Sequence, residues 1–427
     1  MPSRLRRFAV GARFAVGARF EVGARFAVGA IAALLLSAAG GTAQVPRFEG
    51  EHGLAVHLQG DSVVVRWLTA TPQTGRLEVI ANDSVLASHT TATGFAHRAA
   101  FLQPAGAEPD LLLRYGGEGE GANQFRTRIS LSPPARPAIS FESADSIYVL
   151  GDTHGMYDAL VAGLHRASLI DSAGRWTGGR SQLVFAGDLM DRGPDVAGLL
   201  WLVYRLEREA EQAGGRVHVV LGNHDIMVMM GDLRYVHAKE SQLAEWHGMQ
   251  YNRLYDARSS VLGKWLASRP AAIRIGSAVI VHGGLSAEHA RSGLQALDDS
   301  LRHFTAEDLF HTWTDTTGVL GIDSIALQRR NDFFVGSESL FWHRAYVQAD
   351  TMEAELREAL RAVDASLLVV GHTAVDSIHE RYDGRLIAAH TPRFGAELLL
   401  LVRDGDGYRR YRVTERGTEP IAGARRR

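Results

Sequence analysis

Five short apolar runs, each followed by a polar residue and glycine, constrain the fold of this chain most. They are Ile147–Leu150, Leu183–Ala186, Val217–Leu221, Ala278–Val281 and Leu367–Val370. Runs of this length predict strands that are buried on both faces, in sheets covered by helices. Helix-like segments separate the first three runs, and in such α/β sheets the carboxyl ends of the strands carry the ligand sites. We therefore predict an α/β (α+β) fold with a polar site at one end of its strands.

The residues that follow these runs are of types that bind metals. They are Gly151-Asp152-Thr153-His154-Gly155, Gly187-Asp188-Leu189-Met190-Asp191-Arg192-Gly193, Gly222-Asn223-His224-Asp225, His282-Gly283-Gly284 and Gly371-His372-Thr373. Asp, His and Asn suit divalent first-row metals, and a chain without cysteine has no thiolate ligand. Any one segment alone is typical of an ordinary turn, but five in this order predict a metal site.

The spacing of these residues indicates two ions. Asp152 and His154 lie two residues apart and can reach one ion from a single turn. Asp188 can place its oxygens between two ions, and the second ion is completed by Asn223, His282 and His372. Two neighbouring divalent cations neutralise a phosphate ester and activate the water that attacks it.

The whole set resembles the metallophosphoesterases of the calcineurin-like superfamily. The form of Gly187–Gly193 is similar to the protein-phosphatase branch. Gly222–Asp225, Gly231–Val236 and Gly371–Thr373 resemble the Shewanella-like protein phosphatases. The resemblance runs from about Tyr148 to Val402. It implies a metallophosphoesterase-type β-sandwich flanked by helices, and a metal-dependent phosphoric monoester hydrolase.

The resemblance also implies a role for each site residue. Asp152, His154 and Asp188 would bind the first ion, with Asp188 bridging to the second, and Asn223, His282 and His372 would bind the second. His224 would be the general acid, and Asp191 would hold its imidazole in register. The ions would be Mn, Fe or Zn.

Two arginines are expected to bind the phosphoryl group, together with Asn223. Arg192 belongs to the Gly187–Gly193 motif, and Arg344 follows an aromatic segment. Ser339-Leu340-Phe341 stands where a Gly-Pro turn is usual in the family, so the chain departs from the family pattern just before Arg344. His390 lies where the family usually has another polar residue, and we leave it out of the ligand set.

Before the motifs, residues 45–132 alternate between polar and apolar in six short runs. This period of two, with Gly, Asn-Asp and Pro turns, predicts a small all-β sandwich domain. Residues 133–145 begin with prolines and predict a stiff linker. The catalytic domain is expected over residues 146–415 and a basic tail over residues 416–427.

Residues 1–43 have the three parts of a signal peptide. A basic start and four copies of a hexapeptide precede an apolar run of about 13 residues, shorter than the roughly 20 of a membrane span. Small residues follow at Gly41-Thr42-Ala43. We expect a periplasmic or secreted protein without a stable membrane span after cleavage. The alternatives are an uncleaved amphipathic anchor and a start codon placed upstream of a shorter signal. Cleavage leaves 40 basic and 47 acidic residues, a charge of −7 in place of −2, so no nucleic-acid partner is expected.

The predicted function is that of an exported dinuclear-metal phosphatase acting on phosphomonoesters, phosphoprotein Ser/Thr or Tyr included. One alternative is a diadenosine-tetraphosphate-type pyrophosphohydrolase, and another is a non-catalytic binding protein on the same scaffold. Residues 234–256 and 287–331 are rich in aromatics and either cap the site or form a helical subdomain with its own core.

Overall fold

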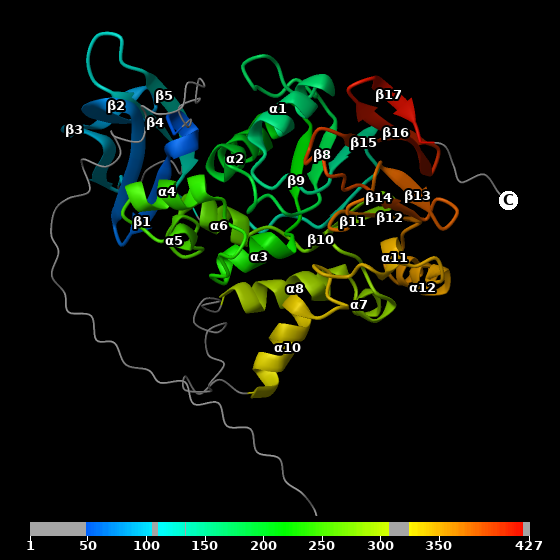
Figure 1. The fold of residues 1–427 in the computed structure, drawn as a ribbon. Helices are drawn as coiled ribbons and strands as arrows, with labels where there is room; N and C mark the ends of the chain where they lie inside the picture. The colour runs from blue at the N-terminus through cyan, green and yellow to red at the C-terminus, as the bar shows by residue number, and fades with distance from the viewer. Residues whose placement is uncertain (1–47, 105–109, 133, 307–323, 422–427) are drawn as a thin grey trace, which may run out of the picture. The chain divides into compact units, whose positions relative to one another are not determined.

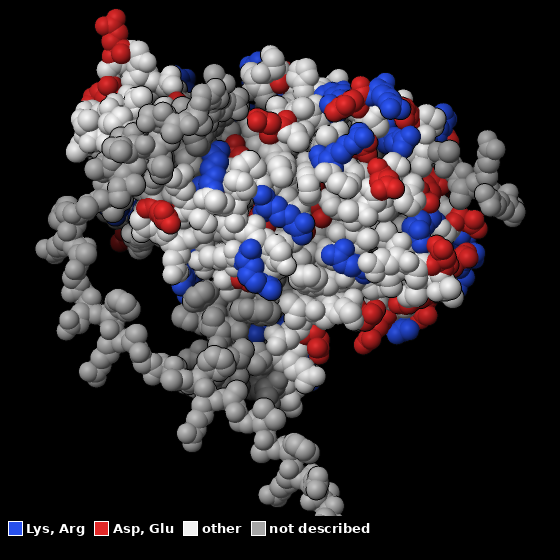
Figure 2. All heavy atoms as spheres, viewed as in Figure 1, with Lys and Arg blue, Asp and Glu red and all other residues white. Residues whose placement is uncertain are grey.

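The computed structural model describes residues 48–104, 110–132, 134–306 and 324–421 (Figure 1). The predicted leader, residues 1–43, lies outside this range, as do the last six residues of the predicted tail. On the face shown in Figure 2, basic and acidic side chains are interspersed. Among the described residues no helix is both long and apolar enough to cross a bilayer.

The described part of the chain starts with a small all-β region in which five strands form one antiparallel sheet. The order is β1-β2-β4-β5, with β3 paired to β2. The sheet follows a 3-10 turn, η1 (Gly50–Gly53), and its strands are β1 (Ala55–Gln59), β2 (Ser62–Ala81), β3 (Ser84–Leu102), β4 (Asp110–Gly117) and β5 (Gln124–Ser130).

The six expected runs fall on five strands because two of them lie on β2. Register shifts between Leu68 and Gly75 divide this strand, so that its first half pairs with β1 and its second half with β4. The hairpin between β2 and β3 turns at Asn82 and Asp83, whose φ angles of 47° and 59° suit a type I′ turn.

Two six-stranded mixed sheets face each other in the catalytic part and confirm the predicted metallophosphoesterase sandwich. One has the order β17-β16-β15-β7-β8-β9 and the other β13-β14-β12-β11-β10-β6. Ile147, Val149 and Val184 of the first sheet pack against Ile280 and Val369 of the second. The strands are β6 (Ser140–Phe141), β7 (Ser146–Leu150), β8 (Gln182–Phe185), β9 (Arg216–Val219), β10 (Ala272–Ile275), β11 (Ala278–Val281), β12 (Leu367–Val370), β13 (His379–Arg381), β14 (Leu386–Ala388), β15 (Leu398–Asp404), β16 (Gly407–Thr414) and β17 (Gly417–Pro420).

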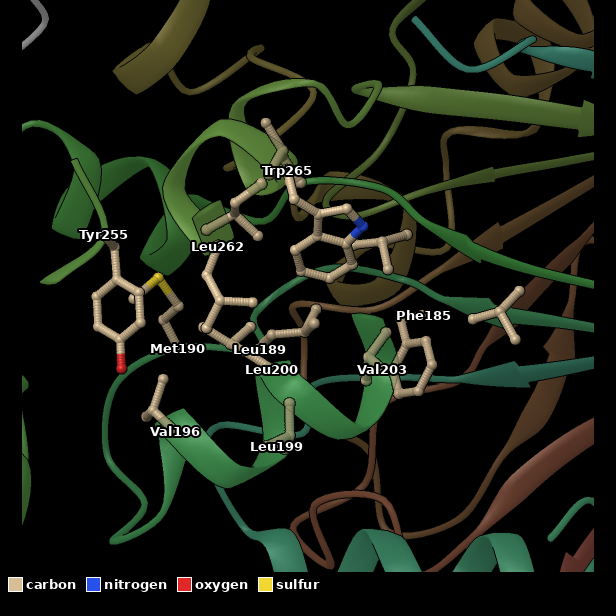
Figure 3. Close-up of a cluster of buried hydrophobic side chains, with 14 of the residues drawn as sticks. Phe185, Leu189, Met190, Val196, Leu199, Leu200, Val203, Tyr255, Leu262 and Trp265 are labelled. Atoms are coloured by element: carbon tan, nitrogen blue, oxygen red, sulfur yellow. The ribbon is translucent and has the colours of Figure 1, made fainter. Parts of the chain in front are cut away.

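Helices cover the outer faces of these sheets. Figure 3 shows side chains of α2 gathered with Phe185 of β8 and with Leu262 and Trp265 of α6, all of them buried. The helices are α1 (Tyr157–Arg166), α2 (Val196–Gln212), α3 (Asn223–Met229), α4 (Ala238–Trp246), α5 (Tyr251–Leu254), α6 (Val261–Ala267), α7 (Ala287–Ser292), α8 (Leu294–Ala306), α10 (Ser324–Val335), α11 (Ala345–Gln348) and α12 (Glu353–Ala362).

The N-terminal sheet and the catalytic part share one hydrophobic core. Polar contacts follow the same seam: Trp201 Nε1 donates to the Leu54 carbonyl at 3.0 Å, and the Ser130 amide donates to the Tyr204 hydroxyl at 3.0 Å. The expected boundaries fall inside paired elements. The segment predicted as a linker contains β6, which pairs with β10, and the segment predicted as a tail contains β17, which pairs with β16.

Candidate dinuclear metal centre

The predicted ligands meet at one end of the two sheets. Asp152 follows β7, Asp188 follows β8, and Asn223 is the first residue of the helix after β9. His282 follows β11 and His372 follows β12. These residues and His154 are each at most 6% exposed. The structure thus brings all six predicted ligands together.

Backbone strain is concentrated at this site. His154, Asp188, Asp191, Arg192 and His372 all have positive φ angles, between 45° and 68°. Such conformations cost free energy in residues with side chains and persist where the surroundings hold them. Gly222 permits the crowding, since a Cβ there would lie 2.1 Å from Asp188 Oδ1. The turns after β7, β8 and β12 therefore have backbone conformations that place the site residues at a cost in local stability.

The first group of ligands surrounds His154. Its Nδ1–H donates to the Met190 carbonyl at 2.8 Å, which leaves Nε2 facing the carboxylates. This atom lies 3.6 Å from Asp188 Oδ2 and 3.7 Å from Asp152 Oδ2. Burial lowers the pKa of His154 to about 4, so the imidazole is neutral and its lone pair can bind a cation.

The second group surrounds His282. Its Nδ1–H donates to the Ala186 carbonyl at 2.8 Å, and its Nε2 lies 2.9 Å from Asn223 Oδ1 and 3.3 Å from Asp188 Oδ2. His372 Nε2 is buried and has no hydrogen-bond partner among the described residues. Candidate ligand atoms of Asp188, His282 and His372 lie within 4.8 Å of one another.

These residues fit two divalent cations. Burial, and then the charge of Asp188, raise the pKa of Asp152 to about 7, because two buried carboxylates are crowded together. The unpartnered Nε2 of His372 is a second unsatisfied group. Bound divalent cations would neutralise the crowded carboxylates and would give His372 Nε2 a partner. Asp188 would be a ligand in both sites.

His390, which the sequence left out of the ligand set, lies in the first group. Its Nε2 is 3.4 Å from Asp152 Oδ2, and its Nδ1 is buried without a hydrogen-bond partner among the described residues. Strand β14 pairs in parallel with β12, with Ala388 opposite Val370. His390 therefore holds the position of His372 on the neighbouring strand. The sequence signal was the apolar run Leu386–Ala389 that precedes it.

Asp225 supports the bridging residue Asp188, a role that was not predicted from the sequence. Its carboxylate accepts the backbone N–H groups of Asp188, Leu189, Met190 and Gly222 at 2.9–3.1 Å. Three of these bonds fix the strained loop after β8 in place, and the fourth ties it to Gly222 after β9. The available signal was its position in the Gly-Asn-His-Asp motif.

The predicted acid and its partners lie beside the ligands. His224 Nδ1–H donates to Asp191 Oδ2 at 2.8 Å, and His224 Nε2 accepts from Arg192 Nη2 at 2.9 Å. The ring of Tyr235 lies 5.1 Å from that of His224 and 5.7 Å from the Arg192 guanidinium carbon. Tyr235 is 45% exposed, so this side of the site opens to solvent.

Arg344 also reaches the site, in spite of the altered turn before it. Its Nη1 donates to the His372 carbonyl at 3.2 Å. Ser339 closes the turn in place of Gly-Pro, since its Oγ donates to the Phe333 carbonyl at 2.5 Å and accepts the Phe341 N–H at 3.2 Å. Burial lowers the pKa of Arg344, and Asp152 and Asp188 act in the opposite direction.

Of the two aromatic segments, one contributes a residue at the border of the site, and their other described aromatics lie mostly in or against the large shared core. Tyr235 borders the site, whereas Tyr251 and Tyr255 are buried. Phe304 packs against Phe333 and Phe334, which belong to the large shared core. Phe310 and Trp313, which the sequence also singled out, lie outside the described residues.

Two buried ligand groups that share Asp188, beside a His–Asp pair and two arginines, define a dinuclear-metal phosphoesterase. The family model of the calcineurin-like phosphoesterases matches residues 146–376, and the chain belongs to this family. The predicted class of enzyme, a metal-dependent phosphoesterase, agrees with this family.

Relatives and solved structures support the same assignment. Shewanella-like protein phosphatase 2 of Arabidopsis thaliana is 32% identical over 38% of this chain and 52% of its own length. Shewanella-like protein phosphatase 1 of Plasmodium berghei is 26% identical over 53% of this chain. The matches span only 52% and 60% of these two relatives.

The crystal structure of a cold-active protein-tyrosine phosphatase of a psychrophilic Shewanella species is also similar. It is 26% identical, with a TM-score of 0.65, and the match covers 87% of this chain and 98% of that one. The likeness therefore extends beyond the residues that the family model matches.

Proposed function

We propose that this protein is an exported phosphatase that hydrolyses phosphomonoesters with two divalent metal ions. The observation that carries the proposal is the position of Asp188, which lies within 3.6 Å of both His154 and His282 and whose Oδ1 accepts the backbone N–H of His224 at 2.8 Å. One carboxylate thus connects the two ligand groups and the predicted acid.

The described residues indicate how each ion would be held. Asp152, His154 and Asp188 would bind the first ion, with His390 within reach, and Asp188, Asn223, His282 and His372 the second. When bound, the pair neutralises the phosphoryl group and lowers the pKa of the attacking water. The ions are proposed to be Mn, Fe or Zn, all of which accept such ligands.

The protein's own groups would bind the ester and donate the proton. Arg192 has an N–H directed at His224 Nε2, the atom that must donate to the leaving oxygen. A phosphoryl group that binds the Arg192 guanidinium would free Nε2 to take up a proton from water, while Asp191 continues to hold Nδ1–H, and this proton is the one donated to the leaving oxygen. Arg344 would bind the phosphoryl group from the side of His372. Substrate binding would thereby prepare the acid.

Aryl phosphates, phosphotyrosine among them, are the proposed substrates. The exposed ring of Tyr235 lies beside both His224 and Arg192, where it can contact an aromatic leaving group. A solved structure similar to this chain is named a protein-tyrosine phosphatase, which supports the same choice.

Hydrolysis of p-nitrophenyl phosphate tests the catalytic proposal. The protein supplied with Mn²⁺ should release phosphate, and Asp188→Asn should lower kcat by a factor of about 10³ or more, because both ligand groups lose charge. Asp364→Asn, at a 99% exposed position, is the matched control and should turn over normally. Activity in Asp188→Asn equal to that of the control would contradict the bridging role. No turnover above a metal-free sample would favour the non-catalytic alternative.

A substrate panel and cell fractionation test the finer points. Phosphotyrosine peptides should have a higher kcat/KM than phosphoserine peptides. Preferential turnover of diadenosine tetraphosphate would instead favour the pyrophosphohydrolase alternative. Export predicts a periplasmic or extracellular protein whose N-terminus, determined by sequencing, lies near residue 44.

A further inference from the structure

His343 is buried next to the site, and its ring is unpaired as far as the chain is described. The side chain is 1% exposed, and neither Nδ1 nor Nε2 forms a hydrogen bond among the described residues. Gly284 leaves the room for it, since a Cβ there would lie 2.5 Å from His343 Nδ1. A buried polar group without a partner lowers the stability of the fold by about 1–3 kcal/mol, so the unpaired ring nitrogens indicate a binding site for a ligand.

Two glutamates face the same ring. His343 Nε2 lies 3.7 Å from Glu338 Oε2, and candidate ligand atoms of His343, Glu338 and Glu355 all lie within 4.8 Å of one another. Within the described ranges neither carboxylate pairs with a lysine or an arginine. The cluster thus combines two uncompensated negative charges with a free imidazole.

We propose that His343, Glu338 and Glu355 bind a third divalent transition-metal ion, separate from the catalytic pair. Bond lengths of about 2.0–2.2 Å place ligand atoms about 3–4.4 Å apart around one ion, which suits the 3.7 Å separation. Glu338 is 61% exposed and can close the remaining gap. One nitrogen and two carboxylate donors favour Zn²⁺ or Mn²⁺ over Ca²⁺.

The electrostatics of His343 agree with a ligand role. Burial lowers its pKa, while Glu338 and Glu355 act in the opposite direction, so the ring is neutral and can offer a lone pair. The Tyr346 hydroxyl lies near, but it donates to the Leu285 carbonyl at 3.0 Å and so does not satisfy the carboxylates.

The ion would join elements that position Arg344. His343 immediately precedes Arg344, and Glu355 lies on α12. A cation bound by both would hold the segment that carries Arg344 against that helix. Its role would be to position this segment, without taking part in the chemistry at Asp188.

Metal content measured by mass spectrometry tests this site independently of activity. The full chain, equilibrated with Zn²⁺ or Mn²⁺ and desalted, should hold one ion more than the double variant Glu338→Gln/Glu355→Gln. Glu358→Gln is the matched control, because Glu358 lies on the same helix and pairs with Arg291 at 2.8 Å. It should bind as many ions as the wild type.

A second set of variants distinguishes the third ion from the two catalytic ions. Asp188→Asn should retain one tightly bound ion, and Asp188→Asn/Glu338→Gln should lose it. Glu338 is exposed, so the substitution Glu338→Gln leaves the fold intact and should by itself weaken binding of one ion at least tenfold. Equal metal content and affinity in wild type and in all the glutamate variants would overturn the proposal, whatever the outcome at Asp188.

Discussion

At the scale of single residues, His224 is the group whose role can be separated most clearly from metal binding. Its Nδ1 is bound to Asp191 and its Nε2 faces Arg192. His224→Asn should lower kcat for an alkyl phosphomonoester by a factor of about 10²–10⁴. It should lower kcat for p-nitrophenyl phosphate far less, since nitrophenolate departs without a proton. Equal losses on the two substrates would argue against the acid role.

His390 gives a second prediction at this scale. Its buried, neutral ring lies 3.4 Å from Asp152, and burial lowers its pKa to about 3. We expect His390→Gln to weaken binding of one Mn²⁺ ion by a factor of about 10–100, as measured by calorimetric titration of the metal-free protein. His379→Gln is the control, because that ring bonds to the Ser377 carbonyl. Unchanged affinities for both ions would remove His390 from the ligand set.

The residues that could be predicted from the sequence follow recognisable strands. Asp152, Asp188, Asn223, His282 and His372 each come directly after a strong apolar run, so their meeting at one end of the sheets was foreseeable. His390 was missed because its nearness to Asp152 depends on the pairing of β14 with β12, which no local pattern encodes. Asp225 was missed because its partners are backbone amides, which leave no mark in the sequence.

At the scale of elements, the start of α2 depends on a buried carboxyl group from α4. Glu240 accepts the Val196 N–H at 3.0 Å, and its second oxygen has no partner among the described residues. Burial, and then Asp195, raise its pKa from 4.5 to about 8. The native state therefore keeps this group protonated to a higher pH than the unfolded state does.

The sign of the pH dependence follows from this difference. As pH rises from about 4.5 to 8, Glu240 ionises in the unfolded state but stays protonated in the native state. This difference lowers the free energy of unfolding by roughly 1 kcal/mol per pH unit. Glu240→Gln keeps an acceptor for Val196 and removes the titration. Urea unfolding should show the variant more stable at pH 8 and no more stable than wild type near pH 4.5. A stability difference that is constant with pH would contradict the buried, protonated state.

The N-terminal strands show what element patterns can and cannot predict. Period-two alternation correctly indicated an all-β region, because alternate residues such as Val63, Val65 and Trp67 face the core. It did not indicate that the runs over Val63–Leu68 and Arg76–Ile80 belong to one strand, since the register shifts between them depend on β1, β3 and β4.

At the scale of the whole molecule, contacts cross the expected boundary between the β region and the catalytic part. His247 Nε2 donates to the Gly53 carbonyl at 3.1 Å, and Arg208 pairs with Asp110 at 2.9 Å. Together with the shared core, these contacts make residues 48–421, as far as they are described, one compact unit. Composition and proline content suggested a linker, but they carry no information on which surfaces are buried against each other.

One core implies one unfolding transition, and Trp67 provides the test. This side chain is fully buried in β2, and its Nε1 donates to the Gly116 carbonyl at 3.1 Å. Trp67→Phe removes this buried hydrogen bond and part of the packing around it, and should lower the free energy of unfolding by about 1–3 kcal/mol. Because the N-terminal sheet and β8 unfold together, native-state hydrogen exchange should show the same loss for the slowest amides of β2 and of β8. Leu102→Ala, at a 73% exposed position on β3, should change neither. A loss confined to β2 would mean that the β region is a separately folding domain, in agreement with the boundary expected from the sequence.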